Sequence, residues 1–241
     1  INSLVGQKVD GIVITPIDPG AIGPAVQNAR NAGIPVVCAD IGKTGPVNAL
    51  LISNNFKGGQ MAMDYIDKLL KAKGNKVMKV GTGNVQPQWT YARERSEGFK
   101  ARAKELGYTV VSEIVVDPPD AAGGYDAMQN MLSAAPDIQG VFFASGREAV
   151  GAANAIKAAG KAIVSVGYNG DPEEIQAIKD GILNATIAQQ PYNIGYESVK
   201  LVKEILAGKK LEDGVVPVDV ALLTPDTIGP FQKDYEAKMA K

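Results

Sequence analysis

Residues 76–116 read KVMKVGTGNVQPQWTYARERSEGFKARAKELGYTVVSEIVV, and this stretch decides the fold class. An apolar run of strand length at residues 76–83 leads through glycines into a segment of helical period at residues 90–107. A second apolar run follows at residues 108–116. A strand, a helix and a strand in that order predict two parallel strands joined by a crossover helix.

The same alternation runs through the rest of the chain. We expect further strands at residues 9–16, 34–40, 47–55, 138–145, 162–170, 183–190 and 214–225, with helices between most of them and a charged helix at the end. Continuous apolar strands separated by helices are typical of a parallel sheet that is covered on both faces. About nine strands exceed what one small sheet usually holds, so the sequence predicts an α/β fold with two doubly wound parallel sheets. Helices that close on Gly33, Gly74, Gly107 and Gly160 predict left-handed C-caps.

Composition argues against several classes of function. The 241 residues carry 25 Lys and Arg against 26 Asp and Glu, whereas proteins that bind nucleic acids or membrane surfaces usually have a basic excess. The chain has no histidine, which is the commonest general base and metal ligand. Its single cysteine, Cys38, lies in the apolar run IPVVCAD and is expected to be a buried core residue. No apolar run approaches the roughly 18 residues of a membrane span.

Three local motifs fail on their spacing. GTGNVQ at residues 81–86 begins like a dinucleotide fingerprint but has Gln86 in place of the third glycine. VDPPDAAGGYD at residues 116–126 lacks the alternating oxygens and the closing glutamate of a calcium loop. Ser145 in ASGREAV is not part of a G-x-S-x-G elbow, and without histidine the usual hydrolase triad is excluded. We therefore expect no enzyme activity, no catalytic residue, no metal and no cofactor.

In an alternating α/β fold, ligands bind at the carboxyl ends of the strands. Those ends carry Asp40, the GTGN segment, Ser145, Asn169 and Gln189, which are mostly amides and hydroxyls. They contain no pair of nucleophile and base, so the pattern favours binding over catalysis. Asp40 has two interpretations: an aspartate that caps a helix or turn, or a carboxylate that accepts hydrogen bonds from the hydroxyls of a ligand.

Two arginines lie in the first turns of the helix expected at residues 90–107. Arg93 and Arg95 are two positions apart, so their side chains point to different faces of that helix. One of them can be solvated while the other reaches over the strand ends. Two exposed arginines are the commoner arrangement, and the residues alone leave both alternatives open.

Seven blocks of sequence carry a family resemblance. In order they are GIVITP, GIPVV, FKGGQMAMDYI, YARERSEGF, MQNML, VGYNGDPE and ATIAQQPYNIG, and together they resemble the type I sugar-binding proteins of bacterial ABC importers, closest to the ribose-binding branch. No block is decisive alone, but the ordered set covers almost the whole chain. The resemblance implies two α/β lobes joined by three crossovers, with the ligand bound between them and a hinge that closes them. Residues 1–54 and 190–222 would form the N-terminal lobe, and residues 55–189 and 223–241 the C-terminal lobe.

The resemblance also implies that the N-terminal lobe is incomplete. Such proteins normally begin with a strand, a helix and a second strand, which amount to about 45–50 residues by the usual size of such a lobe. Without those strands, we expect the lobe to expose a strand edge and apolar surface.

Ligand-binding roles follow from the resemblance by position. Asp40 resembles the first-lobe carboxylate that binds sugar hydroxyls, and Arg95 resembles the second-lobe arginine that bonds to the ring oxygen and the neighbouring hydroxyls. Ser145 stands where the family often has Asn, and Asn169 stands where it usually has Asp. Gln189 matches a family glutamine at a crossover.

Other positions depart from the ribose-binding pattern. Ile41 replaces a basic residue, Pro119 replaces an aromatic residue that stacks on the sugar, and an amide replaces the second-lobe carboxylate. These departures argue against plain ribose as the ligand. We expect Trp89 to supply the missing stacking surface, and Arg93 to face solvent or Glu97.

Together these expectations describe a carrier without catalytic activity. It would be an extracytoplasmic solute-binding protein that captures a monosaccharide or sugar-like polyol and delivers it to the permease of an ABC importer. We expect a monomer that binds no nucleic acid and lies in the periplasm or, with a lipid anchor, on the outer face of the cell. The alternative is the effector-binding core of a lactose-repressor-type transcription regulator, which shares the fold and would carry a helix-turn-helix and a dimer surface.

Overall fold

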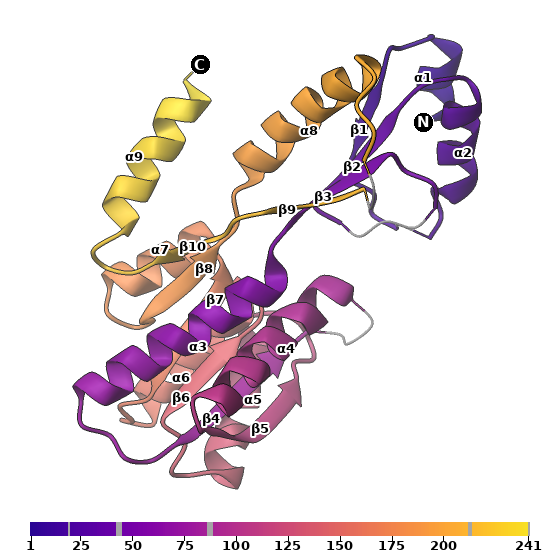
Figure 1. Ribbon diagram of the computed structural model, residues 1–241. Coiled ribbons are helices and arrows are strands. Elements are labelled where there is room, and N and C mark those ends of the chain that lie inside the picture. The colour runs from indigo at the N-terminus through magenta and orange to yellow at the C-terminus, as the bar shows by residue number, and fades with distance from the viewer. Residues whose placement is uncertain (19, 42–44, 86–88, 212–213, 241) are drawn as a thin grey trace. The chain divides into compact units, whose positions relative to one another are not determined.

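The computed structural model describes residues 1–18, 20–41, 45–85, 89–211 and 214–240, and it divides into two compact units. Unit 1 contains Ile1–Asn54 and Gln190–Asp219, and unit 2 contains Asn55–Gln189 and Val220–Lys241 (Figure 1). Each unit is built from two separate segments, so the chain passes from one unit to the other three times. Gln86, which argues against the dinucleotide motif, lies outside the described residues.

Unit 1 is a parallel sheet with helices on its faces. Its strands lie in the order β1-β2-β3-β9, and every neighbouring pair is parallel. The strands are β1 (Ile12–Ile14), β2 (Val36–Ala39), β3 (Ala49–Ser53) and β9 (Val215–Val218), and the helices are α1 (Asn2–Gly6), α2 (Gly23–Asn31) and α8 (Pro191–Leu206). Val37 and Leu51 pack beneath α8, whereas Ile12 and Val36 pack with α2. Successive residues of β2 therefore point to opposite faces, and both faces are apolar.

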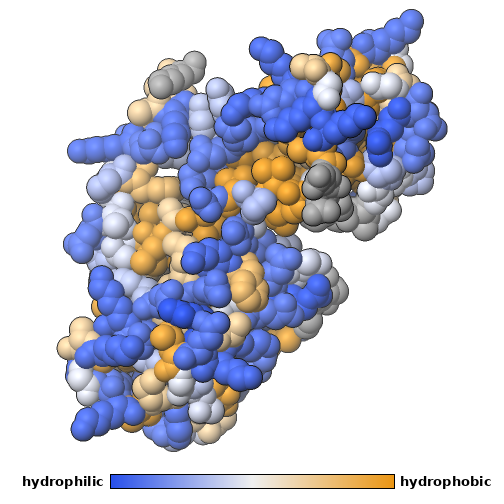
Figure 2. All heavy atoms as spheres, viewed as in Figure 1, coloured by the Kyte–Doolittle hydropathy of each residue, from blue (hydrophilic) through white to orange (hydrophobic). Residues whose placement is uncertain are grey.

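One edge of unit 1 is open within the described part of the chain. There β1 has a neighbouring strand on one side only, and its Val13 is 39% exposed. The outer face of α8 carries the stacked rings of Tyr192 and Tyr196, whose centroids lie 6.1 Å apart, and the exposed Val199. Figure 2 shows further hydrophobic residues gathered over the strands that Figure 1 labels β3 and β9. The expected strand edge and apolar surface are therefore both present.

Unit 2 is a six-stranded sheet with helices on both faces. Its strands lie in the order β10-β8-β7-β6-β4-β5, all parallel except β10, which runs antiparallel to β8. The strands are β4 (Lys79–Asn84), β5 (Thr109–Val115), β6 (Gly140–Phe143), β7 (Val164–Asn169), β8 (Ala185–Ala188) and β10 (Ala221–Leu223), and the helices are α3 (Asn55–Ala72), α4 (Thr90–Glu105), α5 (Ala121–Ala134), α6 (Gly146–Ala158), α7 (Pro172–Lys179) and α9 (Ile228–Met239). Phe142 packs with Ile66 and Phe99 beneath α3 and α4, whereas the next residue, Phe143, packs with Met128 of α5. The central strands are buried on both sides, which explains their continuous apolar runs.

The last extended stretch of the sequence forms two strands in different sheets. β9 pairs with β3 in unit 1, and β10 pairs with β8 in unit 2, where Leu222 lies opposite Ile187. The chain crosses between Asp219 and Val220, so residues 220–222 lie with unit 2, whereas the family resemblance implied that they belong to the N-terminal lobe. The reason is the pairing of β10 with β8. β9 and β10 are both rich in apolar residues, so the sequence carries no signal for the point at which the chain crosses from unit 1 to unit 2.

Glycine marks the helix ends as predicted. Gly33, Gly74, Gly107 and Gly160 have φ angles of 80°, 67°, 83° and 62°. These positive values confirm the left-handed caps, which residues with a Cβ adopt less readily. Cys38 is a free and fully buried thiol, which confirms its place in the core.

Helices α3 and α4 pack closely because each presents a glycine to the backbone of the other. A Cβ on Gly59 would lie 2.0 Å from the carbonyl oxygen of Arg95, and a Cβ on Gly98 would lie 2.0 Å from the carbonyl oxygen of Phe56. Neither glycine leaves room for a methyl group, so the two backbones lie in direct contact.

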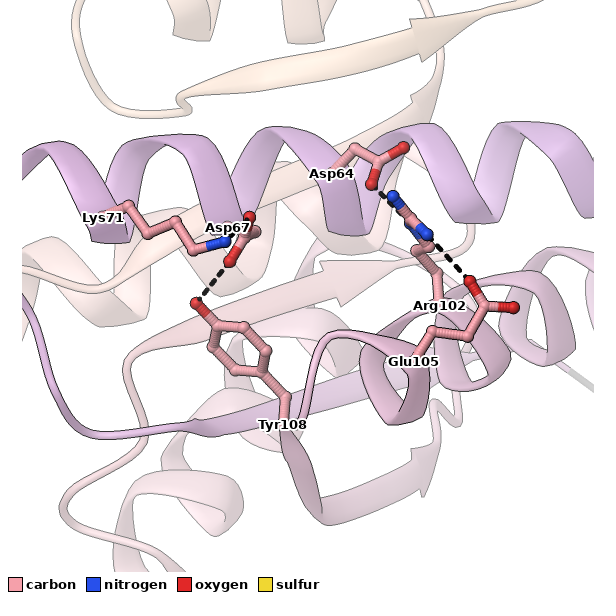
Figure 3. A network of polar contacts seen from close by, with 6 residues as sticks. All are labelled: Asp64, Asp67, Lys71, Arg102, Glu105 and Tyr108. Carbon is pink, nitrogen blue, oxygen red and sulfur yellow. Dashed lines mark hydrogen bonds and ion pairs between the residues drawn. The ribbon is translucent and has the colours of Figure 1, made fainter.

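Polar contacts join α3, α4 and the turn that follows α4 (Figure 3). Arg102 Nε donates to Asp64 Oδ1 at 2.6 Å. Lys71 Nζ and the Tyr108 hydroxyl both donate to the carboxylate of Asp67, at 2.8 and 3.1 Å. Burial, followed by the hydrogen bond to Asp67, raises the pKa of Tyr108 to about 12, so its hydroxyl stays a donor at neutral pH.

We expect Gly98→Ala to destabilise unit 2 by about 2 kcal/mol, because the new methyl group must displace the backbone of Phe56. Gly195→Ala is the matched control, since a Cβ added there on α8 meets no atom within 4 Å. That change should instead stabilise unit 1 by about 0.5–1 kcal/mol through helix propensity. Urea unfolding followed by circular dichroism measures both. An unchanged midpoint for Gly98→Ala would contradict close contact between the helices.

Candidate functional site

The carboxyl ends of four neighbouring strands carry polar residues in unit 2. β4 ends at Asn84 and β7 ends at Asn169. Ser145 lies two residues beyond the end of β6, and Gln189 directly follows β8. These four residues define the polar edge of unit 2. Because the strands lie side by side in the order β8-β7-β6-β4, the polar edge occupies the middle of the sheet, where α/β folds bind ligands.

Arg95 is bonded to this edge and is almost wholly withdrawn from solvent. Its side chain comes from the second turn of α4 and is 4% exposed. Nε donates to Asn55 Oδ1 and Nη1 donates to the carbonyl oxygen of Ala144, both at 2.9 Å, and Nη1 also lies 3.4 Å from Asn169 Oδ1. A guanidinium group that is removed from water needs partners for its donors, so these bonds fix the position of the side chain.

Aromatic rings flank the same guanidinium group. Arg95 Cζ lies 3.8 Å from the centroid of the Tyr168 ring and 4.9 Å from that of Tyr91. Trp89, at the N-cap position of α4, stacks on Tyr91 with 5.9 Å between the centroids and 21° between the planes. Trp89 is 41% exposed, so part of its indole surface faces solvent. The arrangement combines fixed donors with flat apolar surface.

Asn169 connects two other residues with the arginine. Its Oδ1 accepts from Gln189 Nε2 at 3.0 Å, and its Nδ2 donates to Asp171 Oδ2 at 3.2 Å. The φ angle of Asn169 is 121°, a region that a residue with a side chain rarely adopts and that costs about 1–3 kcal/mol. Strained backbone of this kind is concentrated at ligand sites.

Five of the six residues that the sequence indicated lie in unit 2. Arg95, Asn169 and Gln189 are joined by the hydrogen bonds given above, and Trp89 reaches this group through Tyr91. Ser145 follows the residue whose carbonyl oxygen bonds to Arg95, and it is the half-buried N-cap of α6.

Asp40 is the sixth residue, and it lies at the carboxyl end of β2 in unit 1. Its backbone makes a turn with φ of 72°, and its N–H donates to the carbonyl oxygen of Leu51 at 2.7 Å. The side chain is half-buried. Asp40 is therefore a turn residue, which was one of its two interpretations. A turn at the backbone is compatible with the other interpretation, a carboxylate that binds a ligand.

The two arginines of α4 have different surroundings. Arg93 has a side chain that is 49% exposed, and its Nε lies 3.7 Å from Glu97 Oε1, as expected. Arg95 alone reaches the strand ends of unit 2. Of the two alternatives that the sequence left open, the structure therefore has one solvated and one buried arginine.

Sequence reasoning missed several residues of this site. Asn55 is buried at the start of α3 and lies in the polar seam ISNNFKGG, which was the signal available for it. Tyr168 is fully buried, and its hydroxyl donates to Asn55 Oδ1 at 3.2 Å. Its position within an apolar strand indicates a core residue, so no sequence signal marked it. Tyr91 likewise looked like an ordinary helix residue.

Asn84 was part of the GTGN strand end but was not assigned to the ligand. It is 6% exposed, and its Oδ1 has no hydrogen-bond partner within the described part of the chain. A buried amide oxygen of this kind normally has a donor, so a ligand hydroxyl can bond to it.

Among the residues described, no group of three or more His, Cys, Asp and Glu could hold a metal ion, and no helix has the length and apolar character to cross a membrane. A family model described as the periplasmic binding protein domain matches residues 1–210. The chain belongs to the periplasmic binding protein family.

Two relatives of this periplasmic binding protein are named as ribose import binding proteins. It is 39% identical to the ribose import binding protein RbsB of Bacillus subtilis over 214 residues. This match covers 88% of this chain and 68% of the relative. It is also 39% identical to RbsB of Salmonella typhimurium over 221 residues, and this match covers 90% of this chain and 72% of the relative.

Solved structures share the architecture. A carbohydrate transporter solute binding protein from Agrobacterium radiobacter, in complex with D-arabinose, matches with a TM-score of 0.79 and 26% identity over 97% of this chain and 80% of that one. A periplasmic ribose ABC transporter protein from Conexibacter woesei matches with a TM-score of 0.88 over 96% of this chain and 78% of that one. Its identity of 23% supports the fold alone.

Two carboxyl groups of unit 2 are buried in this periplasmic binding protein. Glu148 of α6 is 2% exposed and Glu174 of α7 is fully buried. Burial disfavours the charged form and raises the pKa of both groups above 4.5, that of Glu174 to about 8.

The free energy of unfolding should fall as the pH rises from about 5 to about 8. The folded state holds the proton of Glu174 more tightly than the unfolded state, so this stabilisation is fully present below pH 4.5 and is lost as the pH rises through about 8. Glu174→Gln removes the titration and should reduce the slope, leaving the smaller part due to Glu148. Urea unfolding across this pH range measures both proteins. Identical slopes would contradict the assignment.

Proposed function

We propose that this chain is an extracytoplasmic solute-binding protein that binds a monosaccharide or sugar-like polyol and delivers it to the permease of an ABC importer. The observation that carries the proposal is the buried Arg95 at the polar edge of unit 2, fixed among amides and aromatic rings. Two relatives that match most of the chain are named as ribose import binding proteins, and one similar structure holds D-arabinose.

The chemistry of the polar edge suits a sugar. A sugar presents several hydroxyls, each of which donates and accepts, together with a ring oxygen and a flat apolar face. The amides of asparagine and glutamine donate and accept, a hydroxyl does both, and arginine donates only. Exposed aromatic surface can pack on the apolar face of a sugar ring. Selectivity follows from matching every group, because a buried polar group left without a partner costs about 1–3 kcal/mol.

Roles are assigned by charge and position. Arg95 donates to the ring oxygen and the neighbouring hydroxyls. Asp40, at the carboxyl end of β2, accepts from sugar hydroxyls through a charged oxygen, which makes a stronger hydrogen bond than a neutral one. The other residues assigned to the ligand are Trp89, Ser145, Asn169 and Gln189.

The identity of the sugar is best found with a panel. Ile41 and Pro119 stand where the ribose-binding pattern has a basic and an aromatic residue, so D-ribose is compared with D-allose, D-arabinose and myo-inositol. A bound sugar at 100 times its dissociation constant stabilises the folded protein by about 2.7 kcal/mol, which thermal shift detects. Stabilisation without turnover supports the proposal, and no stabilisation by any member would argue against it.

The family is periplasmic or otherwise extracytoplasmic, and the relatives support association with an ABC importer. We propose further that the protein is a monomer that binds no nucleic acid, with a lipid anchor on the outer face of the cell as an alternative to the periplasm. Light scattering that gives the mass of one chain supports this, whereas a stable dimer would favour the repressor-type core.

We expect Arg95→Ala to lower the affinity for the bound sugar by at least about 100-fold, because charge-assisted hydrogen bonds contribute about 1.5–3 kcal/mol each. Arg93→Ala is the matched control on the same helix, since that side chain is half exposed and paired with Glu97. It should bind like the unaltered protein. Isothermal titration calorimetry measures both, after thermal unfolding has shown that each variant is folded. Retained affinity in a folded Arg95→Ala protein would refute the role of Arg95.

Fluorescence tests the assigned role of Trp89. Trp89 is the only tryptophan of the chain, so the emission reports on this site alone. Saturating sugar should change its intensity or wavelength, because the exposed part of the indole becomes covered. Trp89→Ala should weaken binding by about 10-fold, in line with the 0.5–1.5 kcal/mol of a ring contact plus its buried area. An unaltered spectrum with a proven ligand would remove Trp89 from the site.

A further inference from the structure

The turn that follows β7 is supported from the interior by a carboxyl group. Asn169 and Gly170 have consecutive positive φ angles of 121° and 78°. Glu174 Oε2 accepts from the N–H of Gly170 at 2.9 Å and from the N–H of Asp171 at 3.0 Å. Gly170 N–H also donates to Thr186 Oγ1, at the longer distance of 3.3 Å. Because Asn169 is held in a conformation that is unfavourable on its own, these bonds to the next two residues help to keep the turn in place.

Glu174 has more contacts than its position in the helix requires. α7 begins with a capping box, in which the Asp171 side chain accepts from the backbone of Glu174 and the Glu174 side chain accepts from the backbone of Asp171. A capping box needs no bond to Gly170, which lies before the helix. It also does not require burial, yet Glu174 is fully buried. A buried carboxyl group is unfavourable unless it is well bonded, so the extra bond to Gly170 points to a second role.

Two glycines provide the space for this carboxyl group. A Cβ on Gly167 would lie 2.1 Å from Glu174 Oε1, and a Cβ on Gly146 would lie 2.6 Å from Glu174 Oε2. Gly146 directly follows Ser145, and Gly167 lies two residues before Asn169. The carboxyl group therefore packs against the backbone that carries two residues of the polar edge.

We propose that Glu174 is a positioning residue of the ligand site: it holds the turn at residues 169–171, so that Asn169 Oδ1 stays aligned with Arg95 and Gln189. The proposal rests on the function proposed above. Asn169 Oδ1 lies 3.0 Å from Gln189 Nε2 and 3.4 Å from Arg95 Nη1. Loss of both bonds to Glu174 Oε2 weakens the hold on this turn, because Gly170 N–H then keeps the longer bond to Thr186 Oγ1. The backbone can then leave its positive φ angles, which moves the amide of Asn169 away from both donors. Glu174 thus acts on the ligand through Asn169 and does not contact it.

Amide hydrogen exchange tests the turn without any sugar. Glu174→Ala should speed exchange at the amides of Gly170 and Asp171 by about 10-fold or more, since both hydrogen bonds to Glu174 Oε2 are lost. Glu174→Gln keeps an acceptor oxygen in the same place and should restore most of the protection. Glu173→Ala is the matched control, because Glu173 is exposed in the same first turn. Equal exchange in the folded Glu174→Ala protein and the unaltered protein would overturn the proposal.

Sugar affinity tests the consequence for the site. In calorimetry with D-ribose, D-allose and D-arabinose, Glu174→Ala should lower the affinity by about 10-fold, which corresponds to 1.4 kcal/mol. Glu174→Gln should stay within about 3-fold of the unaltered protein, which is under 1 kcal/mol. Thermal unfolding shows whether each variant is folded. Unchanged affinity in folded Glu174→Ala, or an equal loss in Glu174→Gln, would overturn the positioning role. Absence of binding in the unaltered protein would instead contradict the proposed function, and the exchange experiment would still decide whether Glu174 holds the turn.

Discussion

The burial of the Arg95 guanidinium group is the constraint on which the polar edge of unit 2 depends. A charge removed from water must be compensated by hydrogen bonds and by polarisable neighbours, and Arg95 obtains them from three parts of the unit. Asn55 supplies an oxygen from α3, Ala144 a carbonyl beyond β6, and β7 the amide of Asn169 and the ring of Tyr168. Removal of one of these acceptors takes a hydrogen bond from a guanidinium group that is almost wholly withdrawn from solvent. The geometry of the strand ends is therefore set before a ligand arrives, which reduces the entropy that binding would otherwise lose.

The position of Arg95 depends in turn on the packing of α3 against α4. Gly59 of α3 faces the carbonyl oxygen of Arg95 itself, and Gly98 faces the backbone of Phe56, next to Asn55. The close approach of α3 and α4 thus determines how Arg95 and its partner Asn55 meet. Residues without any functional group contribute to the site by allowing two backbones into contact. Two other residues without a side chain, Gly146 and Gly167, leave room for the carboxyl group of Glu174.

Much of this arrangement could be predicted from the sequence, for identifiable reasons. The alternation of apolar runs with helical segments predicted the parallel sheets, because strands covered on both faces must be apolar throughout. The strand ends indicated Asn169 and Gln189, because alternating α/β folds bind ligands there, whereas only the family resemblance distinguished Arg95 from Arg93. Tyr168 could not be found in this way, since a tyrosine inside an apolar strand looks like core, and it is core as well as a partner of Arg95. The division of the last extended stretch between two sheets was equally hidden, because strand pairing depends on residues far away in the sequence.

The discontinuous make-up of the two units bears on how a nascent chain can fold as it leaves the ribosome. Strands β4 to β8 and their helices form one unbroken stretch, and only β10 must be added to complete that sheet. The first 54 residues, in contrast, must wait for α8 to cover Val37 and Leu51 and for β9 to pair with β3. These elements are synthesised only after the whole of residues 55–189. Residues 55–189 can therefore acquire most of their structure before residues 1–54 do, because residues 1–54 gain α8 and β9 only later in synthesis.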